Sequence, residues 1–177
     1  NTPTGGYISA DNASESHKQI IGNAQPLFTF GWNNTVRYKN WDASVFFRGV
    51  VGNKILNVTR WAYGPQNSVS TNIFMKDAVG TDVKVVDKGH FTDTYLEDGS
   101  YIKLDNLTIG YNFKFKENKY IENLRVYLTG QNLFTITKYS GQDPEVNTTG
   151  VWDAGIDYPD FYPTVATILL GVNISLF

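Results

Sequence analysis

Five long segments of the chain alternate apolar and polar residues with a period of two. Successive side chains of a strand point to opposite faces of a sheet, so this period predicts strands with one apolar and one polar face. In the last segment, Ile168, Leu170 and Val172 share one parity, whereas Gly171 and Asn173 share the other. The predicted strands span residues 27–39, 41–53, 100–115, 123–137 and 164–177.

The length of these strands narrows the fold class. Strands in soluble domains average about 5–6 residues, and the five segments are about twice as long. A tilted strand that crosses a bilayer needs roughly 9–11 residues, which each segment provides. The sequence therefore predicts an all-β protein whose strands form an antiparallel transmembrane β-barrel.

The connections between the predicted strands alternate in length. Residue 40 and residues 116–122 form short turns, whereas residues 54–99 and 139–163 form long connections. Outer-membrane barrels have short turns on the periplasmic side and long loops outside, so both long segments are predicted to be extracellular loops. Aromatic residues close to the two short turns and at the last position predict a girdle at the membrane interface; they are Tyr38, Trp41, Tyr111, Phe113, Phe115, Tyr120 and Phe177.

Five strands are too few to close a membrane barrel. The smallest barrels of this kind have about eight strands, and an open sheet edge is not tolerated in lipid. We therefore expect the chain to supply the last five strands of a larger barrel rather than to fold alone.

Composition and charge exclude several classes of function. The formal net charge is −2, so the chain lacks the excess of basic residues that nucleic-acid binding requires. The chain has no cysteine, which excludes thiol catalysis and a disulfide framework. His17 and His90 are far apart in sequence, and no Ser/His/Asp arrangement or phosphate-binding loop is present. We expect neither an enzyme nor a cofactor.

Four strings of the sequence, in order, carry a family resemblance. They are "IIGNAQPLFTFGWNNTVRYKNWDASVFFRGVVGNKILN" (20–57), "YLEDGSYIKLDNLTIGYNF" (95–113), "LRVYLTGQNLFTITKYSGQDPEV" (124–146) and "YPTVATILLGVNISLF" (162–177). With them the chain resembles the C-terminal barrel region of SusC/RagA-type TonB-linked outer-membrane receptors of Bacteroidota. Residues 58–94 have no obvious counterpart.

The resemblance implies a 22-stranded barrel in the outer membrane of a Gram-negative bacterium, with an N-terminal plug that this chain lacks. It implies import of an oligosaccharide or a peptide, energised by the TonB complex, beneath a SusD-like lipoprotein lid. It also implies that Phe177 belongs to the barrel assembly signal. Leu176 holds the lipid-facing parity, however, so Phe177 is one step out of register, which a late bulge would explain.

Three groups of residues are candidates for function. Arg37, Arg48, Lys114 and Arg125 lie on the polar parity of their strands and are predicted to face the lumen. Aromatic rings of the long loops could stack on sugars, since sugar rings present apolar C–H faces; alternatively they hold their own loops together or contact a lid protein. These rings belong to Trp61, Tyr63, Trp152, Tyr158, Phe161 and Tyr162.

The third group is acidic. Residues 139–163 contain five carboxylates and no lysine or arginine. Oxygen ligands from Asp143, Glu145 and Asp153 could bind calcium, but they lack EF-hand spacing, and a solvated acidic loop is the alternative interpretation.

Two other functions fit parts of the pattern. A soluble carbohydrate-binding β-sandwich would share the aromatic residues and the Asn-rich loops. A barrel could also serve as a siderophore receptor or as a partner in a secretion-associated complex.

Overall fold

In the computed structural model, residues 19–64, 93–115, 120–146 and 153–176 are described. The chain divides into two compact units. The first, called here the sheet unit, comprises residues 27–51, 100–138 and 163–177. The second, called the loop unit, comprises residues 1–26, 52–99 and 139–162, so it is assembled from three separate stretches of sequence.

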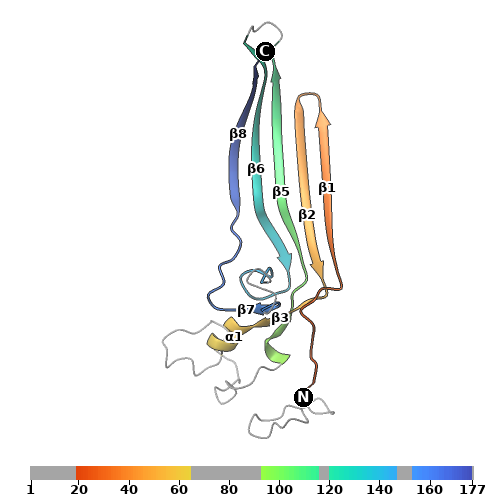
Figure 1. Ribbon diagram of the computed structural model, residues 1–177, viewed down its shortest axis with the longest axis vertical. Helices are drawn as coiled ribbons and strands as arrows, with labels where there is room; N and C mark the ends of the chain where they lie inside the picture. The colour runs from red at the N-terminus through yellow and green to blue at the C-terminus, as the bar shows by residue number, and fades with distance from the viewer. Residues whose placement is uncertain (1–18, 65–92, 116–119, 147–152, 177) are drawn as a thin grey trace. The chain divides into compact units, whose positions relative to one another are not determined.

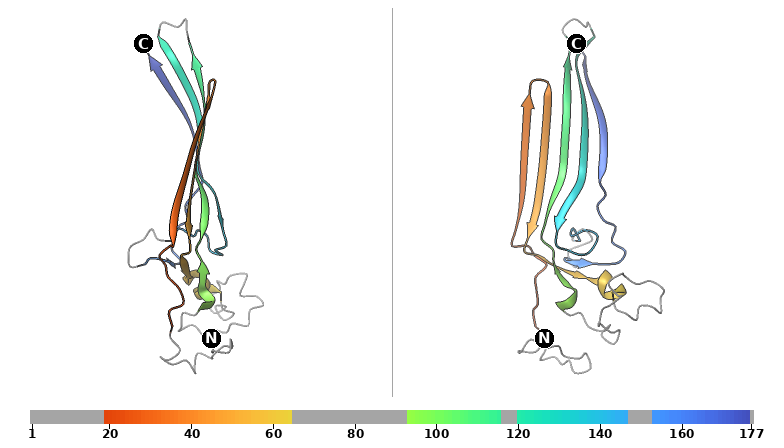
Figure 2. Two further views of the ribbon diagram at one scale, coloured as in Figure 1. Left: turned by 90° about the vertical axis from the view of Figure 1, so that its right-hand side faces the viewer. Right: turned by 180° about the vertical axis from the view of Figure 1, so that it is seen from behind.

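The sheet unit is one antiparallel sheet of five long strands, with the order β1-β2-β5-β6-β8 (Figure 1). Each strand pairs with the next long strand along the chain, as in an up-and-down meander. The sheet is visibly twisted when it is seen edge-on (Figure 2), as expected for paired strands of L-amino acids. The strands are β1 (Phe28–Tyr38), β2 (Trp41–Val51), β5 (Tyr101–Lys114), β6 (Ile121–Thr137) and β8 (Thr167–Leu176).

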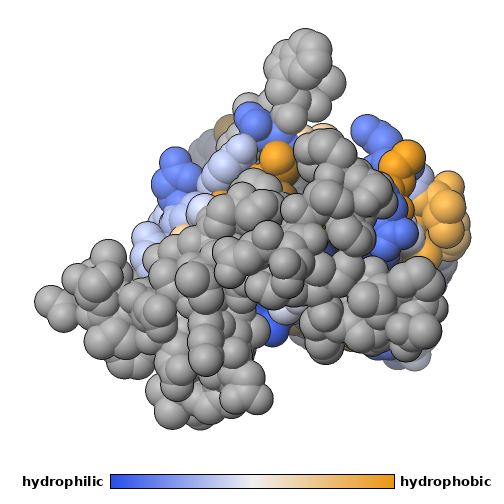
Figure 3. Space-filling view, turned by 90° about the horizontal axis from the view of Figure 1, so that it is seen from below, coloured by the Kyte–Doolittle hydropathy of each residue, from blue (hydrophilic) through white to orange (hydrophobic). Residues whose placement is uncertain are grey.

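The register of the strands collects the large apolar side chains on one face. Val36, Ala43, Ile109, Leu128 and Leu170 are paired in a row across all five strands, and directly paired residues project from the same face of a sheet. Orange hydrophobic residues reach the visible surface at the right margin of Figure 3. The apolar face, as we call it, exposes Phe28, Phe30, Trp32, Val36, Tyr38, Trp41, Ile102, Ile109, Phe113, Leu128, Phe134, Ile136, Ile168, Leu170, Val172, Ile174 and Leu176.

This face is far more exposed than a water-soluble sheet would leave it. Leu170 is 75% exposed and Ile168 is 71% exposed. Soluble monomers rarely expose a contiguous apolar patch of more than a few hundred Å², whereas the apolar face runs across all five strands. The sheet therefore has the outer surface that a lipid-facing wall requires.

On the opposite face, called the polar face, glycines leave space for the side chains of neighbouring strands. Asp42, Gly110, Tyr127 and Gly171 are paired in a row from β2 to β8. Arg125 reaches over Gly110 to Asp42, with Nε–Oδ1 and Nη2–Oδ2 distances of 3.0 and 2.5 Å. A Cβ on Gly110 would lie 2.8 Å from the Arg125 guanidinium. The glycine therefore leaves the space that this bidentate ion pair occupies.

Tyr127 uses the next glycine of the same row in a similar way. A Cβ on Gly171 would lie 2.2 Å from Cζ of Tyr127, so the ring lies over the backbone of β8. The Arg125 guanidinium stacks on this ring at 4.7 Å from its centroid, a favourable cation–π geometry. Two glycines thus allow an ion pair and an aromatic ring to bridge β2, β5, β6 and β8.

A β-bulge keeps the two faces consistent along β5. The pairing of β5 with β2 and β6 shifts around Asp105, and Arg48 Nε donates to Asp105 Oδ1 at 2.6 Å. A bulge of this kind inserts one unpaired residue and re-aims its side chain. Asp105 therefore joins the polar face, while Leu104 and Leu107 stay in register with apolar residues of β2 and β6.

The loop unit contains a small mixed sheet with the order β4-β3-β7. Its central strand β3 (Lys54–Asn57) pairs antiparallel with β4 (Leu96–Asp98) and parallel with β7 (Ile156–Asp157). The short helix α1 (Val58–Tyr63) follows β3, and the 3₁₀ helix η6 (Asp93–Tyr95) precedes β4. These elements lie in segments that we expected to be loops. Ile55, Tyr139 and Val146 form a buried hydrophobic cluster in this unit, and Val58 and Tyr95 are buried as well.

Local backbone chemistry explains two of these boundaries. The predicted strand 41–53 ends at Val51 because Gly52 has a φ of +88°, a conformation that glycine adopts without strain. Helix α1 begins after Asn57, whose side-chain oxygen accepts a hydrogen bond from the Arg60 N–H at 2.8 Å; this is the usual N-cap interaction. In the described part of the chain, no helix has the length and hydropathy needed to cross a bilayer.

Candidate functional site

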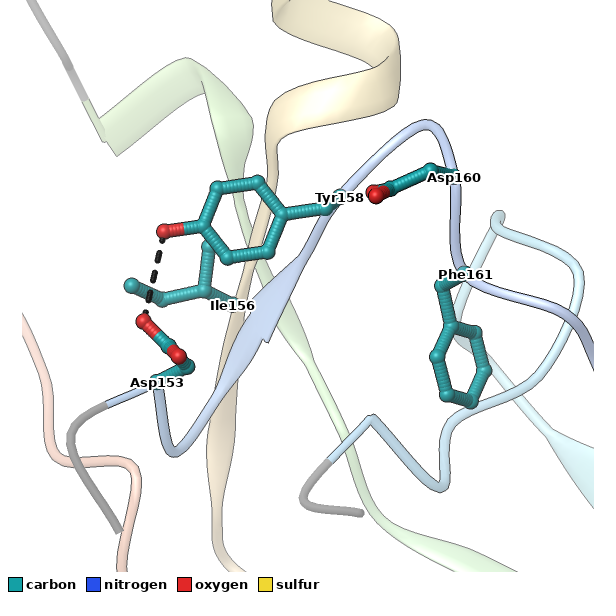
Figure 4. Close-up of a pocket in the computed structure, with 5 residues that line it drawn as sticks. All are labelled: Asp153, Ile156, Tyr158, Asp160 and Phe161. Carbon is teal, nitrogen blue, oxygen red and sulfur yellow. Dashed lines mark hydrogen bonds between the residues drawn. The ribbon is translucent and has the colours of Figure 1, made fainter. Parts of the chain in front are cut away.

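The loop unit contains an open hollow with a volume of about 360 Å³ (Figure 4). Five residues from one short stretch of chain line this hollow. Figure 4 shows the Tyr158 ring and Asp153 side by side near Ile156, with Asp160 and Phe161 further along the same segment. The lining residues are Asp153, Ile156, Tyr158, Asp160 and Phe161.

The backbone of this segment is fixed by strand β7 and by two tight turns. The Leu56 N–H donates to the Gly155 carbonyl at 2.7 Å, which attaches the segment to β3. Gly155 has a φ of +77°, and a Cβ there would lie 2.6 Å from Cβ of Ala24. Only glycine therefore fits this turn without strain. The turns are closed by hydrogen bonds from Ile156 N to the Asp153 carbonyl and from Phe161 N to the Tyr158 carbonyl, both 3.1 Å long.

The hollow combines carboxylates with aromatic rings. The Tyr158 hydroxyl donates to Asp153 Oδ1 at 3.5 Å, at the long limit of a hydrogen bond. Tyr158 is 39% exposed, so its ring is accessible to a ligand. No lining residue is basic. The arrangement can stack an apolar or cationic group on a ring and accept hydrogen bonds from it at carboxylate oxygens.

A partly buried polar network connects several segments of the same unit. Both oxygens of Glu97 accept hydrogen bonds from Ser140, at 2.8 Å from its backbone N–H and 2.8 Å from its hydroxyl. Asn57 also donates to Glu97 at 3.1 Å, and Arg60 forms an ion pair with it at 3.4 Å. These bonds connect β3, α1 and β4 to the chain that follows β6.

The second part of the network is a phenol–carboxylate pair. The hydroxyl of Tyr139 donates to Oδ2 of Asp157, and the two residues are only 5% and 6% exposed. Burial and the neighbouring Asp157 raise the pKa of Tyr139 well above its ordinary value of 10.0. Burial, together with the charges of Glu97 and Asp143, raises the pKa of Asp157, although the bond from Tyr139 opposes this shift.

These pKa shifts predict that the loop unit loses stability at high pH. Above about pH 10 the unfolded chain releases the Tyr139 proton while the folded unit keeps it, so the free energy of unfolding falls as the pH rises. The raised pKa of Asp157 acts with the same sign at lower pH, from about 3.8 upward, because its charged form is disfavoured when buried. We expect the urea midpoint of the loop unit, followed with a fluorophore attached to it in the full-length receptor, to fall between pH 9 and pH 11.

The control for this prediction is Tyr139→Phe, which has no titrating group at this position. Its midpoint is expected to be lower at pH 8, because Asp157 loses a donor, but to decline less between pH 9 and pH 11. An equal decline in both proteins would show that Tyr139 is not responsible.

The structure places the sequence-predicted aromatic residues in the loop unit, apart from one. Tyr158 and Phe161 line the hollow, and Tyr162 follows them at 78% exposure. Trp61 and Tyr63 belong to α1 and do not line it. Trp152 lies outside the described residues, as does Phe177. Ile156 was not predicted as a site residue, since only its place beside Tyr158 after folding distinguishes it; Asp160 was noted only as one of the five carboxylates of residues 139–163 that could bind calcium.

The acidic residues suggested for calcium do not form a metal site in the described ranges. Among those residues no group of three Asp, Glu or His side chains is placed to hold a metal ion. Asp143 instead caps its own turn by accepting the Glu145 N–H at 3.0 Å, and Asp153 accepts from Tyr158.

The four basic residues predicted to face the lumen all lie on the polar face of the sheet unit. In the strand register, Arg37 is opposite Asp42, Arg48 is opposite Lys103, and Arg125 is opposite Asn112. Lys114 is opposite Asn123 and projects from the same face. Two of them are neutralised within the sheet, Arg48 by Asp105 and Arg125 by Asp42. The sequence identified the face of these residues but not these ion pairs.

Comparison with known proteins gives a consistent answer. No family model matches the chain. TonB-dependent receptor P3 of Formosa agariphila is 38% identical over 190 residues, which cover 97% of this chain and 19% of that protein. TonB-dependent receptor SusC of Bacteroides thetaiotaomicron is 31% identical over 155 residues, which cover 82% of this chain and 15% of that protein.

Solved structures agree with these relatives. The RagAB peptide importer in its closed-closed state matches 96% of this chain and 20% of its own, with a TM-score of 0.74 and 25% identity. In its open-open state it matches 85% of this chain, with a TM-score of 0.68 and 26% identity. The chain thus spans about a fifth, or less, of the relatives that it matches. The chain belongs to the SusC/RagA type of TonB-dependent receptors, and its five-stranded sheet is part of the β-barrel wall of such a receptor.

Proposed function

We propose that the protein containing this chain imports a nutrient, an oligosaccharide or a peptide, across the outer membrane with energy supplied through TonB. The observation that carries the proposal is the two-faced sheet, with a continuous exposed apolar face and a polar face of paired charges. Such a wall suits contact with hydrocarbon on one side and with an aqueous, protein-filled lumen on the other. The named relatives support the same activity.

In this proposal the two units have different tasks. The apolar face contacts outer-membrane lipid, and Arg37, Arg48, Lys114 and Arg125 face the lumen. The loop unit lies outside the cell, where Tyr158 and Phe161 contact the substrate and a SusD-like lipoprotein covers the entrance. TonB acts on a plug encoded elsewhere in the protein. The receptor performs no chemistry on its substrate.

Import and substrate contact can be tested separately in cells that carry the full-length receptor. Deleting the gene is expected to abolish growth on the one glycan or peptide pool that the receptor serves. The double substitution Tyr158→Ala and Phe161→Ala is expected to reduce uptake at limiting substrate by roughly tenfold, since each stacked ring contributes about 0.5–1.5 kcal/mol. The amount of receptor in the outer membrane should not change.

The matched control is Tyr120→Ala, which removes an exposed ring (78% exposed) immediately before β6 of the sheet unit. Uptake by this variant should equal that of the wild type. If the gene deletion leaves uptake of every oligosaccharide and peptide unchanged, the proposed import function is wrong.

A further inference from the structure

We propose that the hollow of the loop unit binds an organic cation, an ammonium or guanidinium group carried by the transported substrate. This inference rests on the proposed import function and adds the chemical class of the group that the receptor selects. Its basis is the combination, in one hollow, of two carboxylates with two aromatic rings and no basic residue.

The two charged residues that line the hollow are both acidic. Asp153 and Asp160 are both part of its lining. Residues 139–163 contain three further carboxylates and neither lysine nor arginine. Among the described residues, neither Asp153 nor Asp160 forms a salt bridge. The field of this segment therefore attracts a cation, and the hollow is lined by two of its carboxylates.

The rings add selectivity for an organic cation over an inorganic one. The face of a tyrosine or phenylalanine ring attracts an ammonium or guanidinium group, and its surface also covers the attached methylene groups. Tyr158 is accessible, and its hydroxyl is directed to Asp153. Ile156 adds an aliphatic wall. A hydrated metal ion would gain nothing from these apolar surfaces, in agreement with the lack of a three-ligand metal cluster among the described residues.

The size of the hollow suits one substituent rather than a whole substrate. Its volume of about 360 Å³ is near the lower limit of pockets for small ligands, which start at roughly 300 Å³. One lysine or arginine side chain, or one amino sugar, fits such a space. The hollow would then bind a single charged group of the substrate, while the rest of the substrate lies outside it.

The test measures binding to the full-length receptor in detergent by calorimetry at low salt. The probes are trilysine, tri-norleucine as a chain of similar length without ammonium groups, and the β-1,4-linked glucosamine trimer. We expect trilysine or the glucosamine trimer to bind at least tenfold more tightly than tri-norleucine. A preference for trilysine identifies a basic peptide as the source of the cation, and a preference for the trimer identifies an amino sugar.

The variants test the hollow itself. Asp153→Asn and Asp160→Asn should each weaken cation binding roughly fivefold, because one favourable charge contact is lost, and should leave tri-norleucine unaffected. Tyr158→Leu should weaken cation binding by a similar factor, whereas Tyr158→Phe keeps the ring and should weaken it less. The control Glu122→Gln removes a carboxylate from the sheet unit and should have no effect.

Two results would overturn the proposal: equal affinity for charged and uncharged probes, or cation binding that survives both Asp→Asn substitutions together. Neither result would contradict import, which is judged by the growth of the gene deletion. Conversely, a deletion without any uptake defect would contradict import even if the purified receptor prefers cations.

Discussion

Replacing Leu170 with arginine is expected to lower the free energy of unfolding of the receptor in a bilayer by about 2–4 kcal/mol, the cost of an arginine deep in the hydrocarbon layer. Leu170 is on the apolar face, in the row that runs from β1 to β8, and is 75% exposed there. An arginine at this position would bring a charge into lipid with no partner. Urea titration of the full-length receptor folded into phosphatidylcholine vesicles measures the loss.

Leu169 is the matched control for this prediction. It is the same residue type at the same depth, but it pairs with Thr129 and therefore projects from the polar face. Leu169→Arg should cost less than about 1 kcal/mol, since that face already accommodates charged side chains. If the two substitutions have equal effects, the assignment of the apolar face to lipid is wrong.

Replacing Ile55 with alanine is expected to destabilise the loop unit by about 2–5 kcal/mol. Ile55 is 0% exposed and packs in the core with Tyr139 and Val146. Truncation to alanine removes buried methyl groups and leaves a cavity, which adds to the lost transfer free energy. Native-state hydrogen exchange of the full-length receptor reports the change, because it measures local opening of β3 and β7 separately from the sheet.

Ile20→Ala provides the comparison, because Ile20 belongs to the same unit but is 97% exposed. It should change exchange by less than about 0.5 kcal/mol. The proposal for the hollow also depends on this core, since β7 carries Ile156. Ile55→Ala is therefore expected to weaken cation binding indirectly. Faster exchange confined to the sheet unit, with β3 and β7 unaffected, would contradict this view of the core.

The fold class could be predicted from the sequence because its signal is local. The alternation around Ile168 and Leu170 follows from strand geometry alone, in which neighbouring side chains take opposite faces. The same rule placed Arg37, Arg48, Lys114 and Arg125 on one face, and their paired register agrees. Likeness to the SusC/RagA type came from the order of four sequence strings.

The short elements of the loop unit could not be predicted in this way. Strand β7 has two residues, too few for a period to be recognised, and it exists because Gly155 and Leu56 bring it to β3. The N-cap of Asn57 was detectable in principle, since Asn commonly precedes a helix, but α1 has only six residues. The hollow was only partly anticipated, through Tyr158 and Phe161.

By itself, the sequence determined the strands, their two faces and the family, because these depend on residues close together along the chain. The tertiary structure decided which residues of distant segments contact one another on these faces. Arg125 and Asp42 are 83 residues apart and meet only because β5 places Gly110 between them. The loop unit is likewise drawn from three distant stretches. Pairing and packing over such separations depend on register and shape, and a local period carries no information about either.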